Sequence, residues 1–210
     1  MARFKNKGKA KSLSGLIGNV VLVDGDVVRS KPQKSNHKPT KNEKNNQSKF
    51  AIVNAFIEPF YDFMKHRFKD LFDKKNARDA IRSYHQLYLT TEDNGVHTIN
   101  YPKALMSSGR LRGLHAAGVS LDGRILALVW QDNSEQALAA TTDMLSVAAY
   151  NATEGEAYFF EDCATRGDGQ ALLTFPDYFP TDEVHLWATF EDENNLDCSN
   201  SEYLGLLEGV

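Results

Sequence analysis

The spacing of hydrophobic residues changes once along this chain, near residue 96. Between Lys49, where a first helix is predicted to begin, and Tyr88, apolar residues recur every three or four positions, as they do in helices that bury one face. Pro59 lies within this pattern and predicts a kink or a break in the first helix. Asn76 is a suitable N-cap for a second helix. The pattern therefore predicts a helical pair whose phenylalanine-rich stripe packs on the rest of the chain.

After residue 96 the apolar runs become short and are separated by turn residues. A short strand is predicted at 97–101, and Trp130 lies in one of seven further runs that are rich in β-branched and aromatic residues. Seven short strands with a buried tryptophan are typical of an immunoglobulin- or fibronectin-like β-sandwich, although the Cys…Trp…Cys spacing of antibody domains is absent. The seven predicted strands are 118–121, 124–130, 144–150, 157–160, 171–175, 184–190 and 202–206.

Two valine-rich runs near the N-terminus predict a β-hairpin. An Asp-Gly-Asp turn separates Val20–Val23 from Val27–Val28, which is a strong short-range hairpin signal. Gly15 and Gly18 come before the hairpin and indicate a bend or a close approach of the backbone. The next residues, 30–48, contain two prolines and no apolar side chain, so they are predicted to form an extended arm that reaches across a neighbouring molecule.

Together these patterns predict an α+β protein with three parts. Residues 1–49 form a basic tail, a β-hairpin and an extended arm, and residues 50–95 form two helices. Residues 96–210 form an antiparallel β-sandwich of the immunoglobulin or fibronectin-III type. At 210 residues the chain is long enough to bury a hydrophobic core.

Charge divides the chain in a similar way. Residues 1–49 carry 12 Lys and Arg against 3 Asp and Glu, whereas residues 97–210 carry 5 against 18. A basic arm on an acidic body predicts attraction to an anionic partner, and the body of another copy is one such partner. No apolar segment follows the basic N-terminus, so no secretory signal is indicated, and cytoplasmic synthesis is expected, with assembly in a virion or outside the cell after release. No stretch has the length and apolar character of a membrane span.

The N-terminal motifs resemble those of a family of small uncharacterised proteins encoded by bacteria, phages and prophages. That signature is Ser-Gly-x-x-Gly-x-Val-Val, a short turn, Val-x-Arg, a proline-containing arm, Pro-Thr, and a helix that opens with Gln-x-x-x-Arg-x-x-Phe. The resemblance implies a structural or virion-like role and no established activity. This chain departs from the family where Asp24-Gly25-Asp26 replaces the usual Trp-Lys-Gly. The matching residues are Ser14-Gly15, Gly18-Asn19-Val20-Val21, Val27-Val28-Arg29, Lys31-Pro32, Pro39-Thr40 and Gln47 to Ala51.

No catalytic, cofactor-binding or metal-binding constellation is evident, so neither enzymatic activity nor a cofactor is expected. Arg166-Gly167-Asp168 matches the cell-adhesion tripeptide, but Gly and Asp are also what a turn favours. The acidic residues of 191–197 lack the loop spacing of an EF-hand and are interpreted as a solvated loop. The six histidines show no paired metal spacing. Cys163 and Cys198 could form a disulfide, but two thiols are favoured.

The leading hypothesis is a non-enzymatic structural subunit that assembles head to tail as a filament, a virion component or a similar structure. The hairpin would add to an exposed sheet edge of a neighbour, and the arm would lie over the neighbour's acidic surface. Expected partners are the protein itself and other virion or surface proteins. The expected interface residues are Gly15, Gly18, Val20, Val21, Leu22, Val23, Val27, Val28, Arg29, Lys31, Lys34, Lys38, Lys41 and Lys44.

Two alternative functions use other parts of the chain. The basic arm could bind nucleic acid or another polyanion, weakly and without sequence specificity, because it has few arginines for base readout and one aromatic residue for stacking. The sandwich loops could form a surface-binding or carbohydrate-binding module if Trp130 or Tyr178 is exposed. The sequence leaves the exposure of these two residues open.

Overall fold

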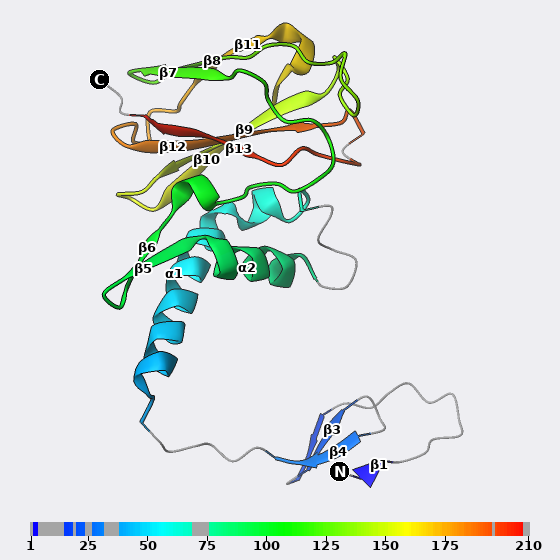
Figure 1. Cartoon of the computed structure of the whole chain (residues 1–210), viewed down its shortest axis with the longest axis vertical. Helices are drawn as coiled ribbons and strands as arrows, with labels where there is room; N and C mark the ends of the chain where they lie inside the picture. The colour runs from blue at the N-terminus through cyan, green and yellow to red at the C-terminus, as the bar shows by residue number, and fades with distance from the viewer. Residues whose placement is uncertain are drawn as a thin grey trace. The chain divides into compact units, whose positions relative to one another are not determined.

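The computed structural model describes residues 2–3, 15–18, 20–23, 27–31, 38–68, 76–194 and 196–207. These residues belong to two compact units, Met1–Thr40 and Lys41–Val210 (Figure 1). The strands of the first unit are called the N-terminal sheet below, and the second unit is called the body. The helical pair and the sandwich therefore share one unit, which begins at Lys41.

The N-terminal sheet has four antiparallel strands in the order β1-β4-β3-β2. The predicted hairpin is confirmed as β3 and β4, which pair with Val23 opposite Val27. The turn between them lies outside the described residues. Gly18, with φ of 60°, follows β2 in the left-handed region that glycine tolerates best. The strands are β1 Ala2–Arg3, β2 Gly15–Ile17, β3 Val20–Val23 and β4 Val27–Ser30.

The body stacks two helices on a sandwich of two sheets (Figure 1). The four-stranded sheet has the order β10-β9-β12-β13, and the three-stranded sheet has the order β11-β8-β7. The helices are α1 Lys41–Met64 and α2 Ala77–Tyr88, followed by the hairpin β5 Thr90–Asp93 and β6 Val96–Ile99. The sandwich strands are β7 Gly118–Asp122, β8 Ile125–Val129, β9 Met144–Asn151, β10 Glu156–Thr165, β11 Gln170–Thr174, β12 Val184–Glu191 and β13 Glu202–Leu207. Short 3-10 turns occur at Tyr101–Lys103 and Arg166–Asp168.

Two hydrophobic cores hold these layers together. The first lies between the helices and the four-stranded sheet, where Phe56 and Phe60 of α1 contact Tyr150 and Trp187. The second lies between the two sheets and includes Leu126, Trp130 and Phe190. Strands β9 and β12 are covered on both faces, so every residue of β12 and all but the first of β9 are buried. Double coverage explains why both strands are mostly apolar, and the buried polar residues among them, such as Ser146, Thr189 and Glu191, are hydrogen-bonded.

The sequence predicted the element types of the body well. All seven sandwich strands are confirmed, as is the N-cap of α2, where the Asn76 side chain accepts a hydrogen bond from the Asp79 amide at 2.9 Å. Trp130, whose exposure the sequence left open, is buried. The phenylalanine-rich stripe packs on the sandwich, as expected. The described part of the chain is thus an α+β fold whose C-terminal part is a β-sandwich.

The predicted start of α1 is wrong, because the helix begins at Lys41 and not at Lys49. Of the kink or break predicted at Pro59, the break is wrong, since α1 continues through Pro59 to Met64. The residues before Lys49 are polar, so hydrophobic periodicity could not reveal this first part of the helix. Pro59 is tolerated because the residues around it, including Ile57 and Phe60, are buried against the sheet, and this packing outweighs one lost backbone hydrogen bond.

Candidate functional site

The side chains of the N-terminal sheet whose exposure is described are poorly buried. Val20, Val21 and Val28 are only half-buried, and none of the side chains with described exposure in residues 15–40 is buried. A four-stranded sheet with such short strands needs an apolar surface on at least one face to be stable. The sheet is therefore a candidate docking element.

The two faces of this sheet differ in charge. Val20 lies opposite Ser30, and Val21 lies opposite Arg29. Because successive side chains of a strand point to opposite faces, Val21 and Arg29 share one face, while Val20, Val28 and Ser30 share the other. One face thus combines valine with a cation.

The predicted interface residues do not all lie where the sequence placed them. Gly15 is in β2, Gly18 follows it, and Val20, Val21, Leu22, Val23, Val27, Val28 and Arg29 are in β3 and β4. Lys31 and Lys38 are exposed, and Lys34 lies outside the described residues. Lys41 and Lys44 belong to α1, so their assignment to an extended arm is wrong.

Part of the predicted docking segment, residues 15–29, lies at an edge of the N-terminal sheet. Strand β3 is flanked by β4 and β2, and β4 is flanked by β3 and β1, whereas β2 is an edge strand. Strands β3 and β4 therefore use their backbone groups within the sheet, and addition of β2 to a neighbouring sheet stays a prediction. Docking through a face of the sheet is a second possible mode.

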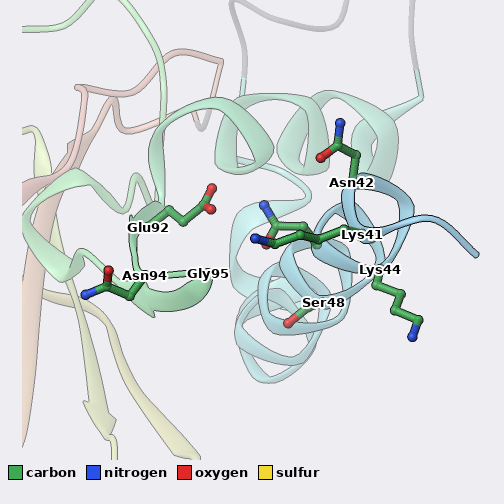
Figure 2. A pocket seen from close by; sticks show the side chains of 8 residues that line it. Lys41, Asn42, Lys44, Ser48, Glu92, Asn94 and Gly95 are labelled. Carbon is green, nitrogen blue, oxygen red and sulfur yellow. The ribbon is translucent and has the colours of Figure 1, made fainter.

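Lys41 and Lys44 line a polar groove in the body, with a volume of about 850 Å³. It lies between the start of α1 and the turn of the β5–β6 hairpin, which contributes Glu92, Asn94 and Gly95 (Figure 2). The side chain of Lys41 extends toward this turn, whereas that of Lys44 points away from it. The groove mixes both signs of charge and is lined by polar side chains, so it offers hydrogen bonds but no apolar anchor.

A second candidate surface is the side of the three-stranded sheet that faces away from the core. Leu126 and Leu128 of β8 point into the core, so their neighbours Ile125 and Val129 point outward, with 45% and 53% of their surfaces exposed. Leu172 of β11 points outward as well and is 73% exposed. We call Ile125, Ala127, Val129 and Leu172 the outer face.

One acidic residue, Asp122, borders the outer face. Asp122 lies directly beside Ile125 in the sheet register and is exposed. Residues 113–210 contain 18 Asp and Glu but only two basic residues other than histidine, Arg124 and Arg166. Arg124 is held by Asp177, by the Phe179 carbonyl at 3.1 Å and by the carbonyls of Pro176 and Asp177. The sandwich as a whole is therefore strongly anionic, and Asp122 is the carboxylate placed beside the outer face.

The Arg-Gly-Asp tripeptide is not available for adhesion. Arg166 is fully buried, and its guanidinium pairs with the Asp143 carboxylate at 3.0 Å and lies 3.9 Å from the centre of the Phe190 ring. The Arg166 carbonyl accepts a hydrogen bond from the Trp130 indole at 2.8 Å. The tripeptide forms a structural turn, and burial of Trp130 also removes it from any surface-binding role; Tyr178 is 73% exposed.

The carboxylates of the acidic loop after β12 accept hydrogen bonds from within the loop and from Arg110. Asp192 accepts hydrogen bonds from the backbone amides of Leu196 and Asp197, and the Asp197 carboxylate accepts one from the Arg110 guanidinium at 3.0 Å. Glu191 is buried and pairs with Arg67 at 2.6 Å. Among the described residues, no group of three or more His, Cys, Asp and Glu could hold a metal ion.

Both cysteines are thiols, as the sequence favoured. The Cys198 thiol donates to the Arg67 carbonyl at 3.0 Å, and the Cys163 thiol donates to the Leu145 carbonyl at 3.2 Å. Burial raises the pKa of Cys163 to about 11, so this thiol is protonated and a poor nucleophile at neutral pH. Neither environment resembles that of a reactive cysteine.

The described residues thus form an α+β protein with a β-sandwich, two uncovered apolar surfaces and strongly segregated charge. The chain belongs to a family of unknown function, DUF6266, whose model matches residues 8–205. Its sandwich is similar to the fibronectin-III domain of the human collagen alpha-1(XX) chain, with 12% sequence identity, a TM-score of 0.35, and coverage of 50% of this chain and 89% of that one. Comparison with curated proteins gave no match. Neither helix that the structure describes has a segment long and apolar enough to cross a membrane.

Proposed function

We propose that this protein is a non-enzymatic structural subunit that associates head to tail, with the N-terminal sheet of one copy docked on the acidic body of the next. One observation carries the proposal: the N-terminal sheet is a unit of its own, yet none of its side chains with described exposure is buried. Ordering such a sheet costs conformational entropy that its own contacts offset poorly. A partner surface would supply the missing burial.

Charge supports another copy as the partner. Residues 1–40 carry 9 Lys and Arg against 2 Asp and Glu, whereas residues 113–210 carry 2 against 18. Opposite potentials accelerate encounter and fix orientation more than they raise affinity. Because the two contacting surfaces differ, the contact is heterologous and produces a ring or an open filament. The resemblance to phage and bacterial proteins is consistent with a filament or a virion component.

Sedimentation velocity of the full-length protein over a concentration series tests this proposal. We expect concentration-dependent growth beyond a dimer, and weaker association when the salt concentration rises, since the charges involved are exposed. Val21→Asp should weaken association at least about tenfold, which corresponds to about 1.4 kcal/mol. Val96→Asp is the matched control, because Val96 is an exposed strand residue of the body.

A second pair of variants distinguishes loss of docking from misfolding of the N-terminal sheet. Arg29 is exposed on β4, so Arg29→Glu should weaken association while the strand is kept, and Arg29→Lys should not. A full-length protein that stays monomeric at every concentration and salt level would contradict the proposal. Unchanged association of both Val21→Asp and Arg29→Glu would exclude the N-terminal sheet as the docking element.

Polyanion binding is a second candidate function, favoured by the position of Lys41 and Lys44 beside asparagine and serine side chains in the polar groove. Non-specific contacts of this type should weaken steeply with salt. Fluorescence anisotropy with generic single- and double-stranded DNA, from low to physiological salt, tests it. No binding at low salt, or equal binding by the Lys41→Glu/Lys44→Glu variant, would exclude this use of the groove.

A further inference from the structure

We propose that the outer face, defined by Ile125, Ala127, Val129 and Leu172, is the surface that receives the N-terminal sheet of a second copy. The inference rests on the proposed head-to-tail association and adds the location of the receiving surface. It replaces the addition of an edge strand with the packing of one sheet face on another.

One face of the sandwich is left uncovered by the rest of the body. The two sandwich sheets have four faces in total, and three of them are covered in the body. The helices cover one face of the four-stranded sheet, and the two sheets cover each other's inner faces. The outer face is the fourth, and its largest side chains, Ile125, Val129 and Leu172, are 45%, 53% and 73% exposed.

The apolar side chains of the outer face are neighbours in the sheet. Leu172 lies directly opposite Ala127 on the neighbouring strand, and Ile125 and Val129 lie two residues to either side of Ala127. Residues at these positions of adjacent strands touch one another on the same face. The four side chains therefore form one connected patch, not scattered exposed residues, and a connected apolar patch is typical of an interaction site.

The N-terminal sheet and the outer face both combine apolar side chains with a charge, and the two charges are opposite. The face of the N-terminal sheet that carries Val21 also carries Arg29, and the outer face carries Asp122 beside Ile125. Two sheets can pack face to face about 10 Å apart with their side chains interdigitated. In that arrangement Val21 covers part of the apolar patch, and Arg29 can reach Asp122, with which no lysine of residues 113–210 pairs.

Leu172→Lys in the full-length protein tests this inference. It places a cation in the centre of the outer face, opposite a basic docking element, and should weaken association at least about tenfold. Leu196→Lys is a closely matched control, because Leu196 is 75% exposed against 73% for Leu172 and lies in the loop after β12. Leu196→Lys should change the association constant less than about twofold. Unchanged thermal unfolding of both variants would show that the sandwich is intact.

The possible results separate this inference from the proposal on which it depends. If the wild-type protein associates and Leu172→Lys weakens that association while Leu196→Lys does not, the outer face is the receiving surface. If Val21→Asp disrupts association but Leu172→Lys does not, the N-terminal sheet docks elsewhere, and this inference is wrong while the proposed function stands. If the wild-type protein never associates, both are wrong.

Discussion

At the scale of single residues, burial decides what a short motif can do. Arg166 belongs to a tripeptide known for adhesion, but its side chain lies in the core beside Asp143, Asn133 and the carbonyls of Arg112 and Gly113. Sequence alone could not distinguish an adhesion loop from a structural turn at this position, because both favour glycine and aspartate. The distinguishing quantity is the exposure of one guanidinium, which depends on tertiary packing.

Replacement of Arg166 should therefore affect stability. Arg166→Ala leaves the carboxylate of Asp143, which is 3% exposed, buried without its cation, and should lower the free energy of unfolding by about 3–5 kcal/mol. Asp168 is exposed and caps the backbone amide of Thr165, so Asp168→Ala should cost only about 1 kcal/mol. Urea denaturation measures both values. Equal effects of the two variants would contradict the structural role of Arg166.

His85 makes the stability of the protein depend on pH. The Leu105 amide donates to Nε2 at 3.3 Å, so Nδ1 carries the proton and donates to the Ile81 carbonyl at 2.8 Å. Burial lowers the pKa of this imidazole to about 4, from an ordinary value of 6.5. Between pH 6.5 and pH 4 the unfolded chain therefore protonates this imidazole more readily than the folded protein does. The contribution of neutral His85 to the free energy of unfolding is complete above pH 6.5 and is lost as the pH falls from 6.5 toward 4.

The His85→Gln variant should lack this pH dependence. Between pH 7 and pH 4.5, the free energy of unfolding of the wild-type protein should fall by about 2.5 kcal/mol more than that of the variant. Urea denaturation at the two pH values measures the difference, which cancels any constant destabilisation by the substitution. His185, whose pKa burial also lowers to about 4, remains in both proteins and serves as an internal reference. Parallel losses in the two proteins would contradict the account of His85.

At the scale of elements, predictions succeeded where the local pattern and the final burial agree. The seven sandwich strands and α2 carry clear periodicity or clear turn signals, and each forms where expected. The polar start of α1 carries no periodicity, although Thr40 and Glu43 fit the Thr-x-x-Glu pattern of a capping box. Strand β5 was missed, although Asn94 and Gly95, with φ of 51° and 83°, form the Asn-Gly turn that is typical of a hairpin.

Pairings between distant segments could not be predicted from the sequence. The pairing of β1 with β4 joins Ala2 to Val28, and no local signal specifies that contact. This pairing makes β4 a central strand of the N-terminal sheet and leaves β2 at one edge, so β3 and β4 themselves do not offer a free edge along their paired residues. The outer face was equally hidden, since strand alternation identifies two faces of β8 but not which layer covers each.

At the scale of the whole molecule, the charges and the uncovered apolar surfaces are arranged for contact between copies. The basic N-terminal unit and the acidic sandwich carry opposite charges on the same chain. Each also presents apolar side chains that its own unit does not cover, such as Val21 and Leu172. A heterologous contact that uses both surfaces would leave one of each free at the ends of an open assembly, so growth can continue.

Mixing two impaired full-length variants tests this account most directly. Val21→Asp damages the docking sheet and keeps the outer face, whereas Leu172→Lys damages the outer face and keeps the docking sheet. Each variant alone should remain largely monomeric in sedimentation velocity at concentrations where the wild-type protein assembles. An equimolar mixture should form a 1:1 dimer and nothing larger, because one intact contact remains and both ends are blocked. A mixture that stays monomeric, or a Val21→Asp variant that assembles like the wild-type protein, would contradict the head-to-tail contact through the N-terminal sheet. A Leu172→Lys variant that assembles like the wild-type protein would contradict only the outer face as the receiving surface.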